Sequence, residues 1–260
     1  MISICCPSRG RPEYAKRLYD SILDTAEAEI EFLLYLNDDD PELDKYFEEF
    51  KDTEVDPIVG KDQSTCYSWN QLAFKAKYDV CFLMGDDVQF TTNSWDKEIL
   101  KIFDQYADKI VMVSPLDNRK SQARRNERII KNMKEPYYIK NFPTHIGTPH
   151  FCLHKNWINA VGYFAPPQFW HWYVDTWTKK IAIKLGRCVI LPYAQYKSKK
   201  FTTDNTARRI RGIKNINERD NWVWEKTQSR WLSAEIDLLK KFIEEYEKSN
   251  GQISLSLIHI

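Results

Sequence analysis

The 260-residue chain has the composition of a globular protein, with 43% hydrophobic and 29% charged residues, which excludes disorder as the state of the whole chain. Its formal net charge is only +1, so the overall balance points neither to nucleic acid nor to an acidic ligand. The 8 glycines are all far apart in the sequence. Motifs that need two nearby glycines, namely GxGxxG, GxxxxGK[ST] and GxSxG, are therefore absent. We expect any bound nucleotide to be held by side chains and a metal ion.

The termini and the cysteines bear on where the protein works. The apolar segment 1–7 is short, lacks a preceding basic region and is followed directly by Arg9 and Arg11, which argues against a signal peptide. No apolar run is long enough to cross a bilayer. The 6 cysteines show no CxxC spacing, which favours buried reduced thiols over disulfides or a zinc site. We predict a cytoplasmic protein, in the host cytoplasm if the gene is viral.

Strands alternate with helices along the first 115 residues. Apolar runs predict strands at 2–6, 31–36, 55–59, 79–84 and 109–114. Helical spacing predicts helices at 13–27, 43–50 and 95–106, and Ser64 is predicted as the N-cap of a helix that runs through Lys77. This alternation predicts an α/β fold with a mostly parallel sheet flanked by helices.

The second half is less regular. Its pattern predicts strands at 148–154 and 187–192, a helix at 156–161, a polar loop at 194–216 and a long charged helix at 218–248. The segment 168–185 begins in aromatic residues and continues as a helix that is closed by Gly186. The last residues, 252–260, no longer follow the helical pattern. Because 255–260 matches one reading frame of a common sequencing adapter, we interpret 252–260 as a non-native tail from an environmental DNA library.

Three polar clusters follow predicted strands, at 7–12, 37–40 and 85–87. Ligands of open parallel sheets bind beyond the carboxyl ends of the strands. Asp86 and Asp87 directly follow a strongly apolar strand, and such an acidic pair needs neutralisation. Mg²⁺ or Mn²⁺ supplies it and is typically held by carboxylates together with phosphate oxygens. For 38–40, a turn or helix cap before Pro41 explains the acids equally well.

In order and spacing, these motifs resemble a glycosyltransferase of the GT-A fold, a Rossmann-like α/β fold, of the family 2 type. The resemblance covers about residues 1–190. Residues 3–12 are similar to the family's first strand and nucleotide loop, Asn70 and Ala76 to its helix before the fourth strand, 82–87 to its aspartate motif, and 161–164 to its acceptor segment. Met84 and Val174 stand where the family often has acids.

The resemblance implies a function for each of these residues. It implies that residues 1–115 form a nucleotide-sugar-binding half, that 116–215 form an acceptor-binding half of the same domain, and that 216–250 form a C-terminal helix. It implies a UDP-sugar donor bound by Pro7, Ser8, Arg9, Arg11, Asp38, Asp39, Asn70 and Asp86. It implies Mn²⁺ or Mg²⁺ on Asp87, assisted by Asp86, and Asp175 as the catalytic base of an inverting reaction. An ordinary acid at a helix N-terminus is the alternative for Asp175.

The charge is unevenly distributed along the chain. Residues 20–56 hold fifteen acids and two lysines, whereas 117–134 carry a net charge of +5 and 194–214 a net charge of +6. Basic residues beside aromatic ones are what DNA binding requires, and an aromatic pocket suits a flipped base. These residues are Arg119, Arg124, Arg125, Arg128, Lys199, Lys200, Arg208, Arg209 and Arg211, with Trp170, His171 and Trp172 between them.

Our working hypothesis for the acceptor is a 5-hydroxymethyl pyrimidine in double-stranded DNA, because the chain resembles GT-A-like enzymes of bacterial viruses that glycosylate such bases. Two alternatives stay open. The basic runs can be solvated loops and the aromatic residues can grip a saccharide or cell-surface glycan, or the chain can be a nucleotide-sugar-binding or DNA-binding module without catalysis.

Overall fold

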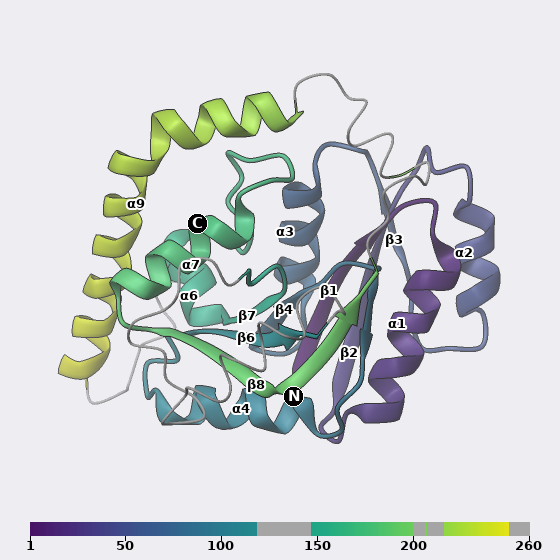
Figure 1. Cartoon of the computed structure of the whole chain (residues 1–260), viewed down its shortest axis with the longest axis horizontal. Helices are drawn as coiled ribbons and strands as arrows, with labels where there is room; N and C mark the ends of the chain where they lie inside the picture. Colours follow the sequence, from purple (N-terminus) through teal and green to yellow (C-terminus); the bar gives the residue numbers. More distant parts are fainter. Residues whose placement is uncertain (119–146, 200–205, 207–215, 250–260) are drawn as a thin grey trace.

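The computed structural model describes residues 1–118, 147–199, 206 and 216–249 (Figure 1). An eight-stranded sheet in the order β3-β2-β1-β4-β7-β6-β8-β5 forms its centre. The strands are β1 (Ile2–Ser8), β2 (Ile30–Asn37), β3 (Ile58–Gly60), β4 (Val80–Leu83), β5 (Val88–Phe90), β6 (Met112–Asp117), β7 (Phe151–His154) and β8 (Cys188–Ser198).

The strand directions give the sheet one edge that gathers most carboxyl ends. Strands β3, β2, β1 and β4 are parallel neighbours, and β6 is parallel to β8. Only β7, which lies antiparallel between β4 and β6, and β5 run the other way. The prediction of a mostly parallel sheet is therefore confirmed, and β1, β2, β4, β6 and β8 all end at the same edge.

Helices cover both faces of the sheet. They are α1 (Pro12–Thr25), α2 (Leu43–Phe50), α3 (Thr65–Lys75), α4 (Trp95–Gln105), α6 (Lys155–Val161), α7 (Val174–Lys184) and α9 (Ile216–Lys248). Alternate residues of β1 supply both cores, because successive side chains of a strand point to opposite faces. Ile4 packs in the core that contains Leu18 of α1, and Cys5 packs in the core that contains Trp177 of α7. Figure 1 shows α9 along the outer side of α6 and α7, which it contacts.

Local signals explain where several elements begin and end. Ser64 caps α3, since its hydroxyl accepts a hydrogen bond of 2.9 Å from the Tyr67 amide, and Ser/Thr caps of this kind stabilise helix starts. Gly186 follows the end of α7 with a φ of +69°, a conformation that favours glycine. All six cysteines are buried free thiols, as the sequence predicts. Among the described helices, none combines the length and apolarity that a membrane span requires.

The segment 168–185, which is predicted to begin in aromatic residues and continue as a helix, is irregular over 168–173 and becomes helical at Val174. A predicted boundary further along the chain is wrong. The loop expected from residue 194 is strand as far as Ser198. There Ala194 and Tyr196 are fully buried between polar neighbours, and the strand pairs with β5, which the sequence analysis does not predict.

Candidate active site at the carboxyl edge of the sheet

The ends of β1 and β4 are joined by a buried polar network. The Ser8 hydroxyl donates to Asp86 Oδ2 at 2.6 Å and lies 2.7 Å from the Tyr46 hydroxyl. Arg11 Nη1 forms an ion pair of 3.0 Å with Asp86 Oδ1. Both oxygens of Asp86, which is only 5% exposed, thus bind protein groups. Burial raises the pKa of Tyr46, so its phenol stays protonated within this network.

Asp87 lies next to this network and is half-buried. A Cβ atom on Gly85 would lie 3.0 Å from Asp87 Oδ1 and 3.3 Å from Cε1 of His150. Any side chain at position 85 would therefore occupy the space between that carboxylate and that ring. The Asp87 carbonyl accepts a 2.8 Å hydrogen bond from the Lys199 amide, which ties this turn to the residue after β8.

These residues fit a divalent cation that takes part of its shell from a substrate. Mg²⁺ is usually held by one or two carboxylates together with substrate phosphates. Within the described ranges, no three His, Cys, Asp or Glu side chains gather into a metal-binding group. Asp87 is the better candidate ligand, because Asp86 uses both of its oxygens in the network above.

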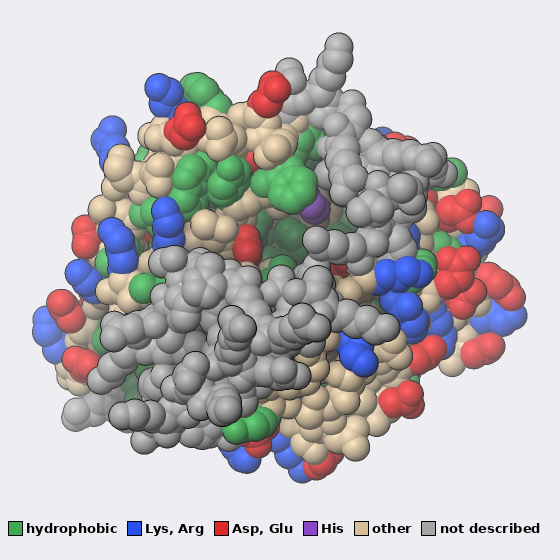
Figure 2. Space-filling view, in the orientation of Figure 1, with side chains coloured by type: hydrophobic (Ala, Val, Ile, Leu, Met, Phe, Trp, Pro, Cys, Tyr) green, Lys and Arg blue, Asp and Glu red, His purple; other side chains and the backbone are tan. Residues whose placement is uncertain are grey.

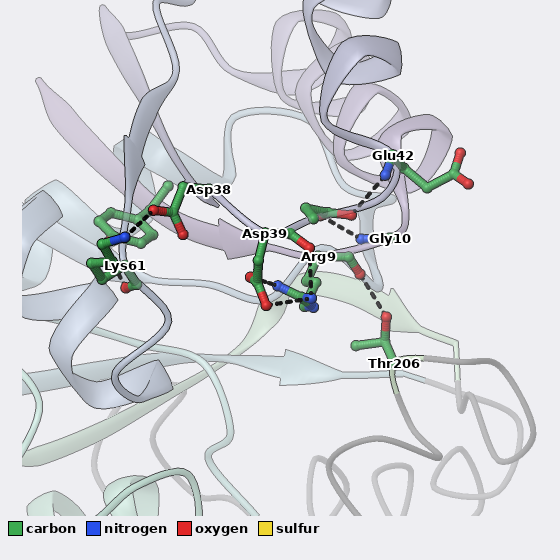
Figure 3. Close-up of polar contacts among 9 residues, drawn as sticks. Arg9, Gly10, Asp38, Asp39, Glu42, Lys61 and Thr206 are labelled. Atoms are coloured by element: carbon green, nitrogen blue, oxygen red, sulfur yellow. Dashed lines mark hydrogen bonds and ion pairs between the residues drawn. The ribbon is translucent and has the colours of Figure 1, made fainter.

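The loop after β1 contacts the acids after β2 (Figure 3). Arg9 forms an ion pair with the Asp39 carboxylate, in which Nη2 lies 3.1 Å from Oδ2, and the same Nη2 donates to the Asp39 carbonyl at 3.1 Å. The Thr206 hydroxyl donates to the Arg9 carbonyl at 2.6 Å. Arg9 therefore connects β1 with the end of β2, as a nucleotide-binding loop requires, although Asp39 stays exposed.

The two other acids of the turn after β2, Asp38 and Asp40, differ in their burial and contacts. Asp40 is buried and accepts from the Gly10 amide at 2.8 Å and the Glu42 amide at 2.9 Å, so the turn-forming alternative applies to this residue. Asp38 is exposed and lies 2.9 Å from the Lys61 ammonium. Asp38 and Asp39 are therefore the acids of the cluster that reach solvent at the predicted nucleotide edge.

Asn70 is placed differently from a nucleotide contact. Its Nδ2 donates to the Ala165 carbonyl at 2.7 Å, and its Oδ1 accepts from the Phe164 and Ala165 amides at 2.8 Å each. The side chain is buried. These three bonds attach the segment that resembles the family's acceptor segment to α3, so Asn70 contributes to the site by positioning that segment.

Of the predicted residues Trp170, His171 and Trp172, Trp170 lines a cavity. His171 Nδ1 lies 2.9 Å from the Thr65 hydroxyl, and Trp172 is 41% exposed. A cavity of about 330 Å³ lies between the start of α3 and this segment, and it is lined by Gln63, Ser64, Tyr67, Asn70, Pro167, Phe169, Trp170 and Arg219. Figure 2 shows this face hollowed near its middle, with hydrophobic side chains and a histidine around the hollow.

The surroundings of His171 favour the neutral form of its imidazole ring. Burial lowers the pKa of His171 against the opposing charge of Asp220, and Arg11 lowers it further. Asp175 lies in the first turn of α7 and is half-buried. The partial positive charge of a helix N-terminus stabilises a carboxylate at such a position.

Three residues that the structure brings to the site were not predicted, namely Tyr46, His150 and Asp220. Asp220 lies in α9, fully buried, and its carboxylate accepts hydrogen bonds from the amides of 170–172. An acid inside a long charged helical pattern reads as a solvated residue, so the sequence carries no signal for this contact. Helix α2, which carries Tyr46, also begins without a side-chain cap, so no capping pattern marks that residue in the sequence.

Most of the predicted basic residues lie outside the described residues, namely Arg119, Arg124, Arg125, Arg128, Lys200, Arg208, Arg209 and Arg211, as does the segment 252–260. Lys199 is described, and its ammonium group binds the Tyr14 hydroxyl and lies 4.6 Å from the centre of that ring. It therefore faces α1 beside the polar loop.

Comparisons with known proteins agree with this geometry. The family model "Glycosyl transferase family 2" matches residues 3–162. A structure of S. aureus TarS 1–349 in complex with UDP matches with a TM-score of 0.58 and 10% identity, over 98% of this chain and 76% of that one. The 1–349 structure with UDP-GlcNAc gives the same values. Another S. aureus TarS structure matches with a TM-score of 0.59 and 12% identity, over 98% and 46%.

The mostly parallel sheet and these structural matches define the GT-A fold, and the family match shows that the protein is a glycosyltransferase. The chain belongs to glycosyl transferase family 2. No curated protein matches its sequence.

Proposed function

We propose that this glycosyltransferase moves a sugar from a UDP-sugar to an acceptor hydroxyl. The observation that carries the proposal is the network of Ser8, Arg11 and Asp86 beside Asp87, at the edge where ligands of parallel sheets bind. The TarS structures bind UDP and UDP-GlcNAc, which supports a donor of this class.

On the donor side, ion pairs hold the two arginines of the loop after β1, which would contact the nucleotide. Asp86 holds Arg11, so that this guanidinium stays close to the place where a diphosphate would lie. Arg9 and the exposed acids Asp38 and Asp39 would border the base. Asp87 would hold Mg²⁺ or Mn²⁺ together with diphosphate oxygens, and the ion would act as a Lewis acid that stabilises the charge on the leaving UDP.

On the acceptor side, Asp175 would act as the general base. The acceptor oxygen attacks C1 of the sugar, its proton passes to the Asp175 carboxylate, and the bond between C1 and the phosphate oxygen breaks to release UDP. Attack on the face opposite the leaving group inverts the anomeric configuration. A positioned base of this kind typically contributes about 10²–10⁴-fold to the rate.

We propose a saccharide as the first acceptor class, with the cavity beside Trp170 as its binding site. Aromatic faces such as Phe169 and Trp170 line this cavity, and apolar rings with a few polar groups are typical of small-ligand pockets. A 5-hydroxymethyl pyrimidine in double-stranded DNA is the second candidate. It rests on the net charges of 117–134, which begins at the last residue of β6, and of 194–214, which begins within the last residues of β8.

The test is a donor and acceptor screen followed by mass spectrometry. UDP-glucose, UDP-galactose and UDP-GlcNAc are first incubated with the protein and Mn²⁺, with EDTA as the control, to measure hydrolysis without acceptor. Each donor is then offered oligosaccharides and DNA containing 5-hydroxymethylcytosine or 5-hydroxymethyluracil. Transfer to DNA alone would overturn the saccharide proposal, and inertness toward all UDP-sugars would overturn the proposed donor.

A further inference from the structure

The carboxylate of Asp220 is fully buried where α9 meets the segment before α7. Its Oδ1 accepts from the Trp170 amide and from Arg219 Nη1, each at 2.9 Å. Its Oδ2 accepts from the amides of His171 and Trp172, also at 2.9 Å each. Two oxygens thus bind four donors, which is the arrangement that an ionised carboxylate satisfies best.

Tyr173, the last residue of the segment 170–173, has a disfavoured backbone conformation. Tyr173 has a φ of +69°, in the left-handed region that a bulky residue rarely adopts. The side chains of α9 hold it there. The Tyr173 hydroxyl donates to Asn221 Oδ1 at 2.8 Å, and its ring stacks on Trp224 with centroids 5.0 Å apart.

The strained residue also sets where α7 begins. Tyr173 is the N-cap of α7, and Asp175 lies in the first turn directly after it. On the other side, the Trp170 carbonyl accepts from the Cys66 amide of α3 at 3.3 Å. The segment is therefore held between α3 and α9, and its conformation decides the direction in which α7 presents Asp175.

We propose that Asp220 is a positioning residue for sugar transfer, which fixes the 170–173 segment and through it the cavity wall at Trp170 and the general base Asp175. This inference rests on the proposed function for the role of Asp175. Asp220 lies behind the backbone of the segment, so it acts through these residues and does not itself touch the substrate.

Asp220 binds the amides of 170–172 through its two carboxylate oxygens. We therefore expect the charge and the two acceptor oxygens of this side chain to matter more for holding the segment than its size. An Asp220→Asn side chain is nearly the same size, but its amide nitrogen would face at least one of the donors that now bind an oxygen. The same substitution at Asp237, an exposed acid of the same helix, alters no such contact and is the matched control.

The experiment compares wild type, Asp220→Asn, Asp220→Glu and Asp237→Asn. For Asp220→Asn we expect at least tenfold faster hydrogen exchange at the amides of 170–172. We also expect kcat for transfer to fall about 10- to 100-fold, while the Kd for UDP changes less than twofold. Asp237→Asn is expected to match wild type, and Asp220→Glu to regain part of the exchange protection. Asn221→Ala, an exposed change that removes the Tyr173 hydroxyl contact and a 3.3 Å hydrogen bond to Glu225 within the same helix, is the second variant should Asp220→Asn not fold, with an expected loss of kcat of about twofold to fivefold.

A folded Asp220→Asn protein with wild-type exchange and wild-type kcat would overturn the proposal. An equal loss of kcat and UDP binding would overturn it as well, because it would show general damage to the fold. If wild type transfers sugar to no acceptor, the proposed function fails, whereas the exchange rates still decide whether Asp220 holds the segment.

Discussion

Arg11 and Asp86 form an ion pair of 3.0 Å that joins the loop after β1 to the end of β4. Their side chains are only 13% and 7% exposed. Removal of one partner of a buried pair leaves an uncompensated charge, which costs more than the pair contributes. The ion pair therefore couples the predicted nucleotide loop to the aspartate motif.

A double-mutant cycle measures this coupling. We expect Arg11→Met and Asp86→Asn each to lower the free energy of unfolding by roughly 2–4 kcal/mol, with a coupling energy of about 1–3 kcal/mol. The exposed pair of Glu48 and Lys51 at the end of α2 is the control, because such pairs contribute only about 0.2–1 kcal/mol. Urea unfolding of the four variants gives both values. A coupling as small as that of the control pair would contradict the prediction.

Asp87→Asn is expected to abolish metal-dependent turnover with little change in stability. The amide cannot supply the negative charge that a divalent cation requires, and the half-buried side chain is not part of a core. Calorimetric titration of Mn²⁺ in the presence of UDP measures the loss of binding. The control is Asp79→Asn. Asp79 is an exposed acid just before β4, at the opposite end of that strand from Asp87, and this variant should bind Mn²⁺ as wild type does. Unchanged Mn²⁺ affinity in Asp87→Asn would sink the metal assignment.

Asp175→Asn separates a catalytic base from a helix-stabilising acid. We expect kcat to fall about 10²–10⁴-fold, because the acceptor proton has no carboxylate to receive it, whereas the Kd for the UDP-sugar stays unchanged. Glu218→Gln removes an exposed acid from the first turn of α9 and controls for the loss of a helix N-terminal charge, which is worth about 0.3–1 kcal/mol. Equal kinetic effects in the two variants would show that Asp175 is only a helix-stabilising acid.

Asn70→Asp tests whether this residue positions the 164–165 segment. A carboxylate can still accept from the Phe164 and Ala165 amides, but it would face the Ala165 carbonyl that now receives a hydrogen bond. We expect a loss of about 1–3 kcal/mol in stability, with the Kd for UDP unchanged in the folded protein. Asn93→Asp, an exposed substitution, should alter neither. Thermal unfolding and calorimetry supply the measurements, and a selective loss of UDP binding would restore Asn70 as a nucleotide contact.

Glu235 gives a prediction for pH. Burial raises its pKa, against the opposing effect of the Tyr163 and Trp177 hydrogen bonds. An acid whose pKa is higher in the folded state stabilises the fold fully below its unfolded pKa, and this contribution is lost as the pH rises through the folded pKa.

Glu235→Gln removes this pH dependence while it keeps the acceptor. Tyr163 and Trp177 both donate to the same oxygen of Glu235, which the amide oxygen of glutamine can replace. We therefore expect the Tm of Glu235→Gln relative to wild type to rise as the pH increases from 4 to 8. Glu244→Gln, an exposed change in the same helix, should show a flat difference. A flat difference for Glu235→Gln as well would refute the prediction.

The elements that the sequence predicts best are those marked by a local signal. Helix α2 is predicted with its observed bounds, and Ser64 is predicted as the cap of α3, because apolar spacing and capping residues act within a few positions. The acids after β4 are found in the same way. Strand β5 spans three residues, too few for a periodic pattern, and its pairing with β8 is a tertiary contact.

The function of Asp220 escapes sequence reading for a similar reason. Its three backbone partners lie about 50 residues earlier in the chain, and backbone amides leave no side-chain pattern to recognise. Asn70 is found by its motif, but its partners at 164 and 165 emerge only when α3 and the segment after α6 are placed together. Motifs thus locate residues, and tertiary contacts decide what these residues do.

The direction of the strands has a consequence for how such enzymes diversify. Six strands end and two begin at one edge of the sheet, so the connection between β6 and β7 both leaves and re-enters the fold there. Replacement of that connection by one of different length would change the edge of the sheet that holds the proposed site, while every strand keeps its neighbours. An ancestor with this sheet can exchange one acceptor for another by loop replacement and inherit its donor chemistry intact.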